Sequence, residues 1–594
     1  MIQNSVNGKK EQSYSNAKPK NTRHTLKKLW RYISYYKFSF ILGIILSIIG
    51  NVLGLIGPYI TGKALGLLEG DFEIKKVLYL CLILAVFYVI SAIFNYILSR
   101  IMAKISQKVT YKMRADLFNK LAIVPVKYFD NNQIGDIIAR MSYDIDTVSV
   151  SLSTDFVSIF TSIFTIVISF VMMIVMSFYL SLIFFITIPL TVFITTKLSS
   201  IVRKRMRERN AALGNINGFS EEYISGVKTV QSYAREEKII KEFDSINDNV
   251  AKLSSEAGYY STIVGPVTNV TSNISVALVG IVGVLLLLHN LIIYGPLASF
   301  LLYSRRFSGP INNISTMYAE IQSAIAAAER VFSVIDTASE SPDKISDTNL
   351  NEIDGNIEFK DVDFSYETDK KILYDITFGN TLKKKIAIVG PTGSGKTTII
   401  SLLLRFYDIN KGVINLDNNN IYDIKRSSER KAFTLVLQDT WLFSGTILDN
   451  IRYGTSNASM ETIIEVCKKA KIHNYIISLK DGYNTILTEN GINISKGQRQ
   501  LLIIARALLS DTKILVFDEA TSNVDTGTEI EIGDAITELT KDKTSIIIAH
   551  RLSTIISADQ IIVLKDGHII ETGTHNELIN KKGFYQELFN SQFE

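Results

Sequence analysis

The chain has little cysteine and little charge for its length. Only two of its 594 residues are cysteines, Cys81 and Cys467, and they stand in distant segments of different character. This spacing excludes a secreted scaffold held together by disulfides. Charged residues make up 20% and hydrophobic residues 47% of the chain, so the low hydrophobicity and high net charge of disordered proteins are both absent. A formal net charge of +5 on this length does not argue for a nucleic-acid partner.

Charge is absent altogether from four long stretches. These are residues 38–62, 77–99, 156–196 and 259–304, which contain no Asp, Glu, Lys or Arg. A helix needs about 20 apolar residues to cross the hydrocarbon of a bilayer, so the stretches correspond to one, one, two and two crossings. The sequence therefore predicts six membrane helices, at about 38–62, 77–99, 156–177, 180–197, 260–288 and 296–320. Helices of a soluble core seldom run so far without charge, which disfavours that alternative.

The flanking charges predict how the chain is oriented. The first 31 residues carry eight Lys or Arg against the single acid Glu11, so this end is expected to be cytoplasmic. Six crossings return the C-terminal part to the same side. Two polar, helix-rich connections, 100–155 and 197–258, are expected to extend into the cytoplasm. Asn51 and Asn95 lie inside apolar stretches, where they either bridge helices or line a path. With no ionisable side chain expected in the crossings, nothing indicates a proton relay.

The C-terminal third carries a phosphate-binding motif. An apolar strand, 385–389, leads into Gly390-Pro391-Thr392-Gly393-Ser394-Gly395-Lys396-Thr397-Thr398 and then into an apolar helix. Residues 390–397 match G-x-x-x-x-G-K-[ST] in the strand–loop–helix context that this motif requires. Backbone N–H groups and the helix N-terminus would cradle phosphates there, while Lys396 reaches the β- and γ-phosphates and Thr397 coordinates Mg²⁺.

A second motif places two carboxylates at the end of a buried strand. Residues 514–517 are apolar and are followed by Asp518 and Glu519. Ligands of open α/β sheets bind at this edge of the sheet. Asp518 suits the Mg²⁺ shell, and Glu519 suits the polarisation of an attacking water. Alternatively, the two carboxylates have only a structural role and cap the end of the strand before the helix that follows.

With these motifs in place, the chain resembles an ATP-binding cassette exporter half-transporter over about residues 25–590. The resemblance implies that Tyr366 stacks on adenine, that Gln438 senses Mg²⁺, and that His550 contacts the γ-phosphate. Residues 522–525 occupy the place of the D-loop. Ser495, Gly497 and Gln498 match the signature segment, which caps the ATP held by the opposing subunit. Ile494 and Lys496 depart from the family pattern L-S-G-G-Q, and Lys496 puts the contribution of this segment in doubt.

The resemblance also implies the organisation of the chain. We expect a basic cytoplasmic tail (1–30), an all-α transmembrane domain of the type IV exporter fold (31–330), a linker (331–350), and an α/β P-loop nucleotide-binding domain (351–594). The cofactors would be ATP and Mg²⁺, and the location a bacterial cytoplasmic membrane. The tips of the cytoplasmic helices, near 142–148 and 225–235, are expected to dock beside Gln438 and the segment 488–491.

A complete ATP site in this family needs two chains face to face. The motifs at 435–443 and 522–525 resemble the catalytically competent half of bacterial heterodimeric multidrug exporters, so a second, different half-transporter is the expected partner and a homodimer the alternative. Glu519, His550, Lys396 and Gln438 would serve catalysis. The expected activity is ATP-driven export of hydrophobic or amphipathic molecules. An ATP-gated channel or regulatory protein remains open, whereas a soluble clamp on DNA and an importer are disfavoured.

Overall fold

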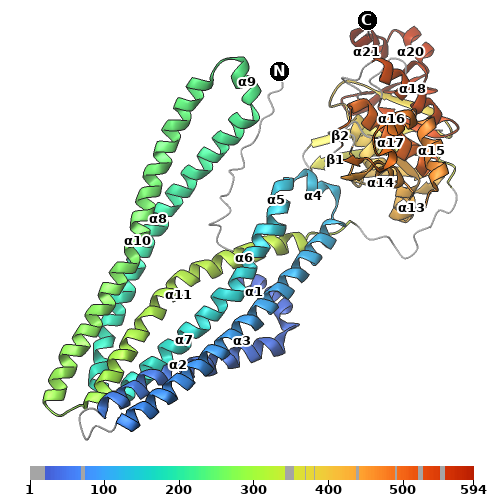
Figure 1. Cartoon of the computed structure of the whole chain (residues 1–594). Helices are drawn as coiled ribbons and strands as arrows, with labels where there is room; N and C mark the ends of the chain where they lie inside the picture. The colour runs from blue at the N-terminus through green and yellow to red at the C-terminus, as the bar shows by residue number, and fades with distance from the viewer. Residues whose placement is uncertain are drawn as a thin grey trace. The chain divides into compact units, whose positions relative to one another are not determined.

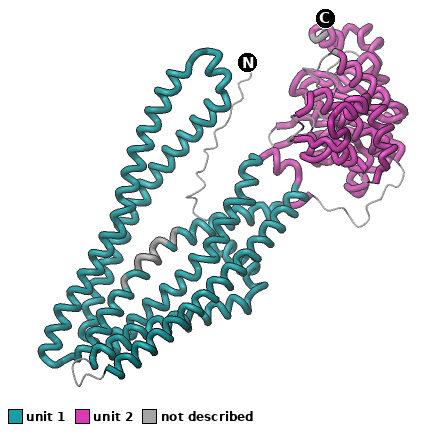
Figure 2. Tube along the Cα trace, viewed as in Figure 1, with its two compact units in different colours: residues 1–124, 132–337 teal, residues 125–131, 338–594 magenta. Residues whose placement is uncertain are grey.

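The computed structural model divides into two compact units, which are described separately. Unit 1 comprises residues 1–124 and 132–337, and unit 2 comprises 125–131 and 338–594 (Figure 2). The structure describes residues 21–67, 74–340, 353–367, 370–379, 381–436, 441–455, 457–488, 491, 493–518, 526–548 and 555–593.

Unit 1 is entirely helical (Figure 1). Its α-helices are α1 (Thr22–Ser34), α2 (Lys37–Gly66), α3 (Ile74–Leu121), α5 (Ile134–Ala139), α6 (Ile145–Val150), α7 (Phe156–Met176), α8 (Phe178–Ser225), α9 (Val227–Ser232), α10 (Glu236–Leu288) and α11 (Tyr294–Ile335). The π-helical turns η1 (Arg140–Asp144) and η2 (Ser151–Asp155) join α5, α6 and α7 into one continuous helical stretch. The long helices α8 and α10 lie side by side and are joined through α9 (Figure 1).

Five helical stretches in the described part of the chain are long and apolar enough to cross a membrane. They are Lys37–Gly66, Ile74–Leu121, Ile134–Met176, Phe178–Ser225 and Glu236–Leu288. Each satisfies its backbone groups internally, as hydrocarbon demands. The sixth predicted crossing, 296–320, lies within α11, a continuous helix that carries Arg305 and Arg306. The expectation that no crossing contains an ionisable side chain is therefore wrong for α11.

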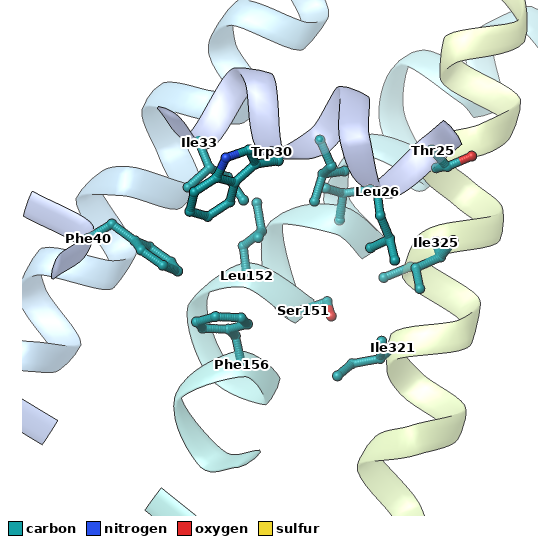
Figure 3. A pocket seen from close by; sticks show the side chains of 13 residues that line it. Thr25, Leu26, Trp30, Ile33, Phe40, Ser151, Leu152, Phe156, Ile321 and Ile325 are labelled. Atoms are coloured by element: carbon teal, nitrogen blue, oxygen red, sulfur yellow. The ribbon is translucent and has the colours of Figure 1, made fainter. Parts of the chain in front are cut away.

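The helix α1 begins at Thr22, inside the segment predicted as a tail, and it is amphipathic. Its apolar side covers a cavity of about 180 Å³ in unit 1, between α1, the start of α2, the η2–α7 junction and α11 (Figure 3). The residues that line the cavity are apolar except for Thr25 and Ser151: Leu26, Leu29, Trp30, Ile33, Phe40, Val148, Leu152, Phe156, Ile321, Ala324 and Ile325. The basic side chains Arg23, Lys27 and Arg31 remain exposed, which suits a helix lying at a membrane interface.

Unit 2 is an α/β domain built on three sheets. Its strands are β1 (Ile357–Glu367), β2 (Lys370–Phe378), β3 (Lys385–Val389), β4 (Lys411–Leu416), β5 (Asn419–Asn420), β6 (Phe433–Val436), β7 (Gly445–Thr446), β8 (Ile486–Leu487), β9 (Ile514–Asp518), β10 (Thr544–Ile548), β11 (Gln560–Lys565) and β12 (His568–Gly573). The main sheet has the order β12-β11-β3-β10-β9-β6, in which only β12 is antiparallel, and the second sheet has the order β2-β1-β4-β5.

Helices cover the main sheet and bury its apolar strands. They are α12 (Lys396–Leu403), α13 (Arg426–Lys431), α14 (Ile447–Arg452), α15 (Met460–Lys469), α16 (His473–Ser478), α17 (Lys496–Ser510), α18 (Thr526–Thr540), α20 (His575–Lys581) and α21 (Phe584–Phe593), with the 3₁₀ turns η3 (Ile421–Asp423) and η4 (Gly482–Asn484). β3, β9 and β10 are buried on both faces, as the continuous apolar runs predict. The short helix α4 (Val126–Asp130) also belongs to unit 2, although it follows α3 in the chain.

A buried ion pair fixes α11 to η1 within unit 1. Arg330 donates two hydrogen bonds to the carboxylate of Asp144, from Nε at 2.9 Å and from Nη2 at 2.5 Å. The Asp144 side chain is only 1% exposed. Loss of the guanidinium leaves this carboxylate buried and uncompensated.

We therefore expect Arg330→Ala to lower the free energy of unfolding by about 3–5 kcal/mol. The matched control is Arg114→Ala, which removes the exposed pair with Asp146 and should cost about 1 kcal/mol or less. Thermal unfolding of the purified protein in detergent measures both. Equal shifts in Tm for the two variants would contradict the prediction.

Candidate functional site

The loop between β3 and α12 has the geometry of a phosphate cradle. Gly390 ends the strand with φ +155°, and a Cβ there would stand 2.1 Å from the backbone oxygen of Leu564 on β11. Only glycine allows this approach. The Lys396 ammonium is buried beneath the loop and donates hydrogen bonds to the carbonyl oxygens of Gly390 at 2.7 Å and Pro391 at 3.0 Å. Lys396 thus holds the loop in a curled form, and the Ser394 N–H closes the curl by donating to the Pro391 carbonyl oxygen at 3.2 Å.

The site also contains a donor that lacks a partner. Ser394 is 3% exposed, and among the described residues no hydrogen-bond partner reaches its buried Oγ. A buried hydroxyl of this kind is costly unless a ligand satisfies it. Its position inside the loop, one turn before Thr398, is where a phosphate oxygen would enter. The orphaned hydroxyl and the buried cation together fit a bound nucleotide phosphate.

Strand register brings Asp518 to the same edge of the sheet. Ile548 of β10 is paired with Ile388 of β3 on one side and with Asp518 of β9 on the other. Asp518 therefore lies two strands from β3, about 10 Å across the sheet. Burial lowers the pKa of the Lys396 ammonium, and the nearby Asp518 carboxylate opposes this shift. The carboxylate and the ammonium thus share one electrostatic site.

Several of the predicted residues lie outside the described residues. These are Gln438, Glu519, His550 and the D-loop segment 522–525. The described strands β9 and β10 end at Asp518 and Ile548, directly before Glu519 and close before His550. Pro391, Thr392, Gly393, Gly395 and Thr397 are all described and lie in the loop or the first turn of α12.

Tyr366, predicted to stack on adenine, lies near the end of β1. Its hydroxyl is 3.0 Å from the Thr398 Oγ1, and its ring meets the Tyr407 ring edge-on at 4.8 Å. These contacts attach the aromatic side chain directly to α12, which carries the phosphate loop. The residues therefore stand where a base and a phosphate of one nucleotide could be held together.

The helix α4 packs beside Tyr366, which the sequence did not predict. Lys127 Nζ donates to the Tyr366 carbonyl oxygen at 3.3 Å, and the Tyr407 hydroxyl donates to the Asp130 carboxylate. Burial, followed by this hydrogen bond, raises the pKa of Tyr407. A cavity of about 460 Å³ lies between α4, Tyr366 and Tyr407. The segment 142–148 lies in unit 1, and Gln438 lies outside the described residues, so its expected docking beside Gln438 stays a prediction. The only sequence signal for α4 was Pro125, which interrupts a helical connection.

The signature segment forms the N-terminus of α17. Ser495 is the N-cap, its Oγ accepting a hydrogen bond from the Gln498 N–H at 3.2 Å while its own N–H donates to Gln498 Oε1 at 3.0 Å. Ile494 is 8% exposed within the main core, so it packs where the family pattern has leucine. Lys496 is exposed at the first helical position. Its cation adds to the positive end of the helix dipole.

A helical membrane unit followed by a P-loop α/β unit defines a membrane protein with its own nucleotide-binding domain. Residues 40–311 match the family model for the ABC transporter transmembrane region, and residues 373–522 match the ABC transporter model. An uncharacterized ABC transporter ATP-binding protein, YfiC of Bacillus subtilis strain 168, is 40% identical over 589 residues, covering 99% of this chain and 97% of the relative.

Two further comparisons agree. A fatty acid ABC transporter ATP-binding/permease protein of Mycobacterium bovis is 36% identical over 485 residues, covering 80% of this chain and 75% of the relative. The solved structure of a bacterial Atm1-family ABC exporter with ATP bound superposes with a TM-score of 0.78 at 25% identity, covering 94% of this chain and 98% of that one. The chain therefore belongs to the ABC transporter family.

These findings confirm the predicted fold class and the predicted enzyme class. The chain is a multi-pass membrane protein with an ATP-binding domain, and it is an ATP-driven exporter with the activity of an ATPase translocase. Exporters of this family act as pairs of such chains in a membrane.

The phosphate loop gives a direct test of these contacts. Gly390→Ala should abolish ATP binding and lower Tm, because the added Cβ collides with the Leu564 carbonyl. Gly393→Ala is the control: Gly393 has φ +86°, and no atom of the described residues lies within 4 Å of an added Cβ, so only backbone strain of about 1–2 kcal/mol applies. Fluorescence of a bound ATP analogue and thermal unfolding report the outcomes. If both variants bind alike, the Gly390 contact is not required.

Proposed function

We propose that this chain drives the export of hydrophobic or amphipathic molecules across a bacterial cytoplasmic membrane by alternating access. The observation that carries this proposal is the position of α4. Only a few residues separate α4 from α3, and the stretch α5–α7 follows it, yet α4 packs on unit 2 at Tyr366 and Tyr407. A rearrangement of the base-binding side of unit 2 would therefore move a helix that short turns connect to two membrane-spanning stretches.

The catalytic roles follow from the residues around the loop. Lys396 would bind the β- and γ-phosphates, Glu519 would polarise the attacking water, and His550 would contact the γ-phosphate. Thr397, Asp518 and Gln438 would hold Mg²⁺, since hydroxyl, carboxylate and amide oxygens are its preferred ligands. The ion would neutralise charge on the phosphates.

The complete site is proposed to form between two chains. Ser495, Gly497 and Gln498 at the α17 N-terminus would face the γ-phosphate bound by the opposing chain. Lys496 would add a positive charge there and need not weaken the contact. The tip helix α9, which has no buried residue in the single chain, would dock on the partner. We propose that the partner is a different half-transporter, with the N-terminus and both nucleotide domains cytoplasmic.

The cargo class is supported by the long apolar surfaces of unit 1. The Mycobacterium bovis relative is named for fatty acid transport, which is consistent with an amphipathic cargo for this chain. ATP can drive the change between inward-open and outward-open forms only through its different affinity for the two.

Glu519→Gln separates an exporter from an ATP-gated channel. In reconstituted vesicles this variant should retain ATP binding but lose hydrolysis by at least about 10²-fold, because it removes the general base. Substrate accumulation should stop with it. Substrate flux that persists in the Glu519→Gln variant would instead indicate an ATP-gated channel. Lys396→Met, which loses ATP binding, is the control.

Co-purification tests the proposal that the partner is a different half-transporter. A tagged chain purified from its host in mild detergent should bring down one second half-transporter that lacks the glutamate corresponding to Glu519. Mass spectrometry identifies the partner. Full transport-coupled ATPase activity from the chain purified alone would instead support the homodimer.

A further inference from the structure

A polar pocket lies among the apolar helices of unit 1. Its volume is about 300 Å³. It is lined by residues of four helices: Gly50, Asn51, Gly54 and Leu55 of α2, Tyr88, Ser91 and Asn95 of α3, Thr165 of α7, and Arg306 of α11. Polar lining in membrane helices marks helix bridges or ligand paths, so the depth and hydrogen bonding of these residues decide which applies.

By chain position, the pocket lies near the middle of the predicted membrane crossings. Asn51 and Tyr88 are at or beside the midpoints of the charge-free stretches 38–62 and 77–99. Arg306 follows the first residue of α11, Tyr294, by 12 residues. That separation is about 18 Å along a helix, a little over half of the roughly 30 Å hydrocarbon thickness. A cation at such depth is expensive unless it faces a polar site, and it marks function by default.

Among the described residues, Arg306 has only neutral hydrogen-bond partners. It donates hydrogen bonds to the Gly54 carbonyl oxygen at 2.6 Å and to the Tyr88 hydroxyl at 3.3 Å, and its guanidinium carbon lies 5.9 Å from the Tyr88 ring centre. No Asp or Glu of the described residues forms an ion pair with it. A guanidinium has five N–H donors, so further donors remain for an anion.

The pocket wall carries a second donor, Asn51 Nδ2, for which no partner is found among the described residues. Asn51 Oδ1 accepts a hydrogen bond from Thr165 Oγ1 at 3.3 Å, which orients the amide, but no partner among the described residues reaches the buried Nδ2. Gly50 and Gly54 keep the pocket open between α2 and α3, since a Cβ on either would stand 3.5 or 3.3 Å from Asn95 or Ser91. A cation, a hydroxyl and an unused amide N–H₂ therefore border one space.

We propose that this pocket binds the oxyanion of an amphiphile, a carboxylate or a phosphate, against Arg306, with the apolar tail along the membrane helices. The inference rests on the proposed export function and deepens it by naming the class of cargo. Arg306 and Asn51 supply the charge and the second donor, and the depth of the pocket selects molecules that partition into the bilayer.

Binding without nucleotide tests this site apart from transport. A fluorescent long-chain fatty acid is titrated into the purified full-length protein in detergent, and oleate, lysophosphatidate and methyl oleate are used as competitors. We expect Arg306→Gln to weaken binding of the fatty acid at least tenfold and to leave competition by methyl oleate unchanged. The relative potency of oleate and lysophosphatidate as competitors shows whether the wild-type protein prefers a carboxylate or a phosphate.

The matched control is Arg305→Gln, which removes the neighbouring charge on the same helix and should bind as the wild type does. Arg306→Lys keeps the cation and should retain binding within about threefold. Equal affinity in Arg306→Gln and the wild type overturns the proposal. So does an equal loss for the acid and its methyl ester, which would mean that Arg306 only braces α2 against α11.

Binding and vesicle transport, measured together, also distinguish a failure of the proposed oxyanion site from a failure of the proposed export function. Arg306-dependent binding without ATP-driven accumulation in vesicles would support the site and refute export. ATP-driven accumulation of neutral molecules that is indifferent to Arg306→Gln would support export and refute the site.

Discussion

The attachment of α4 to the nucleotide-binding unit is the contact on which the proposed transport mechanism depends. Lys127 and Asp130 tie a five-residue helix to Tyr366 and Tyr407, and no covalent linkage other than the chain itself joins α4 to the membrane helices. The Tyr366 hydroxyl in turn contacts Thr398 on the helix that carries the phosphate loop. The predicted base-stacking residue, the phosphate loop and α4 are therefore joined by one set of side-chain contacts.

The predicted phosphate site and the proposed oxyanion site arrange their cations in the same way. In each, a cation is held by neutral oxygens rather than by a carboxylate ion pair: Lys396 by two loop carbonyls, and Arg306 by a helix carbonyl and a tyrosine hydroxyl. Each has an orphaned donor beside it, Ser394 Oγ or Asn51 Nδ2. Neutral hydrogen-bond acceptors position a cation without forming an ion pair with it, so the cation can still attract an arriving anion.

Patterns confined to short segments made most of the fold predictable. The apolar runs gave the membrane helices, and the strand–loop–helix motif gave the phosphate cradle, because both depend on local periodicity and spacing. Three features were not predictable from local sequence patterns. The packing of α4 and the contacts of Tyr407 depend on tertiary structure alone. Arg306 was overlooked because its helix was counted by length, and only the folded helices show that it borders a pocket with Asn51 and Tyr88.

One helix of unit 1 links the proposed oxyanion pocket to the helical stretch that follows α4 in the chain. α11 carries both Arg306 and Arg330, and Arg330 is fixed by Asp144 in that stretch. Movement of α4 would therefore reach the pocket through a rigid helix and one buried ion pair. This route needs two alternative packings of α11, because packed helices shift between discrete arrangements rather than deform continuously.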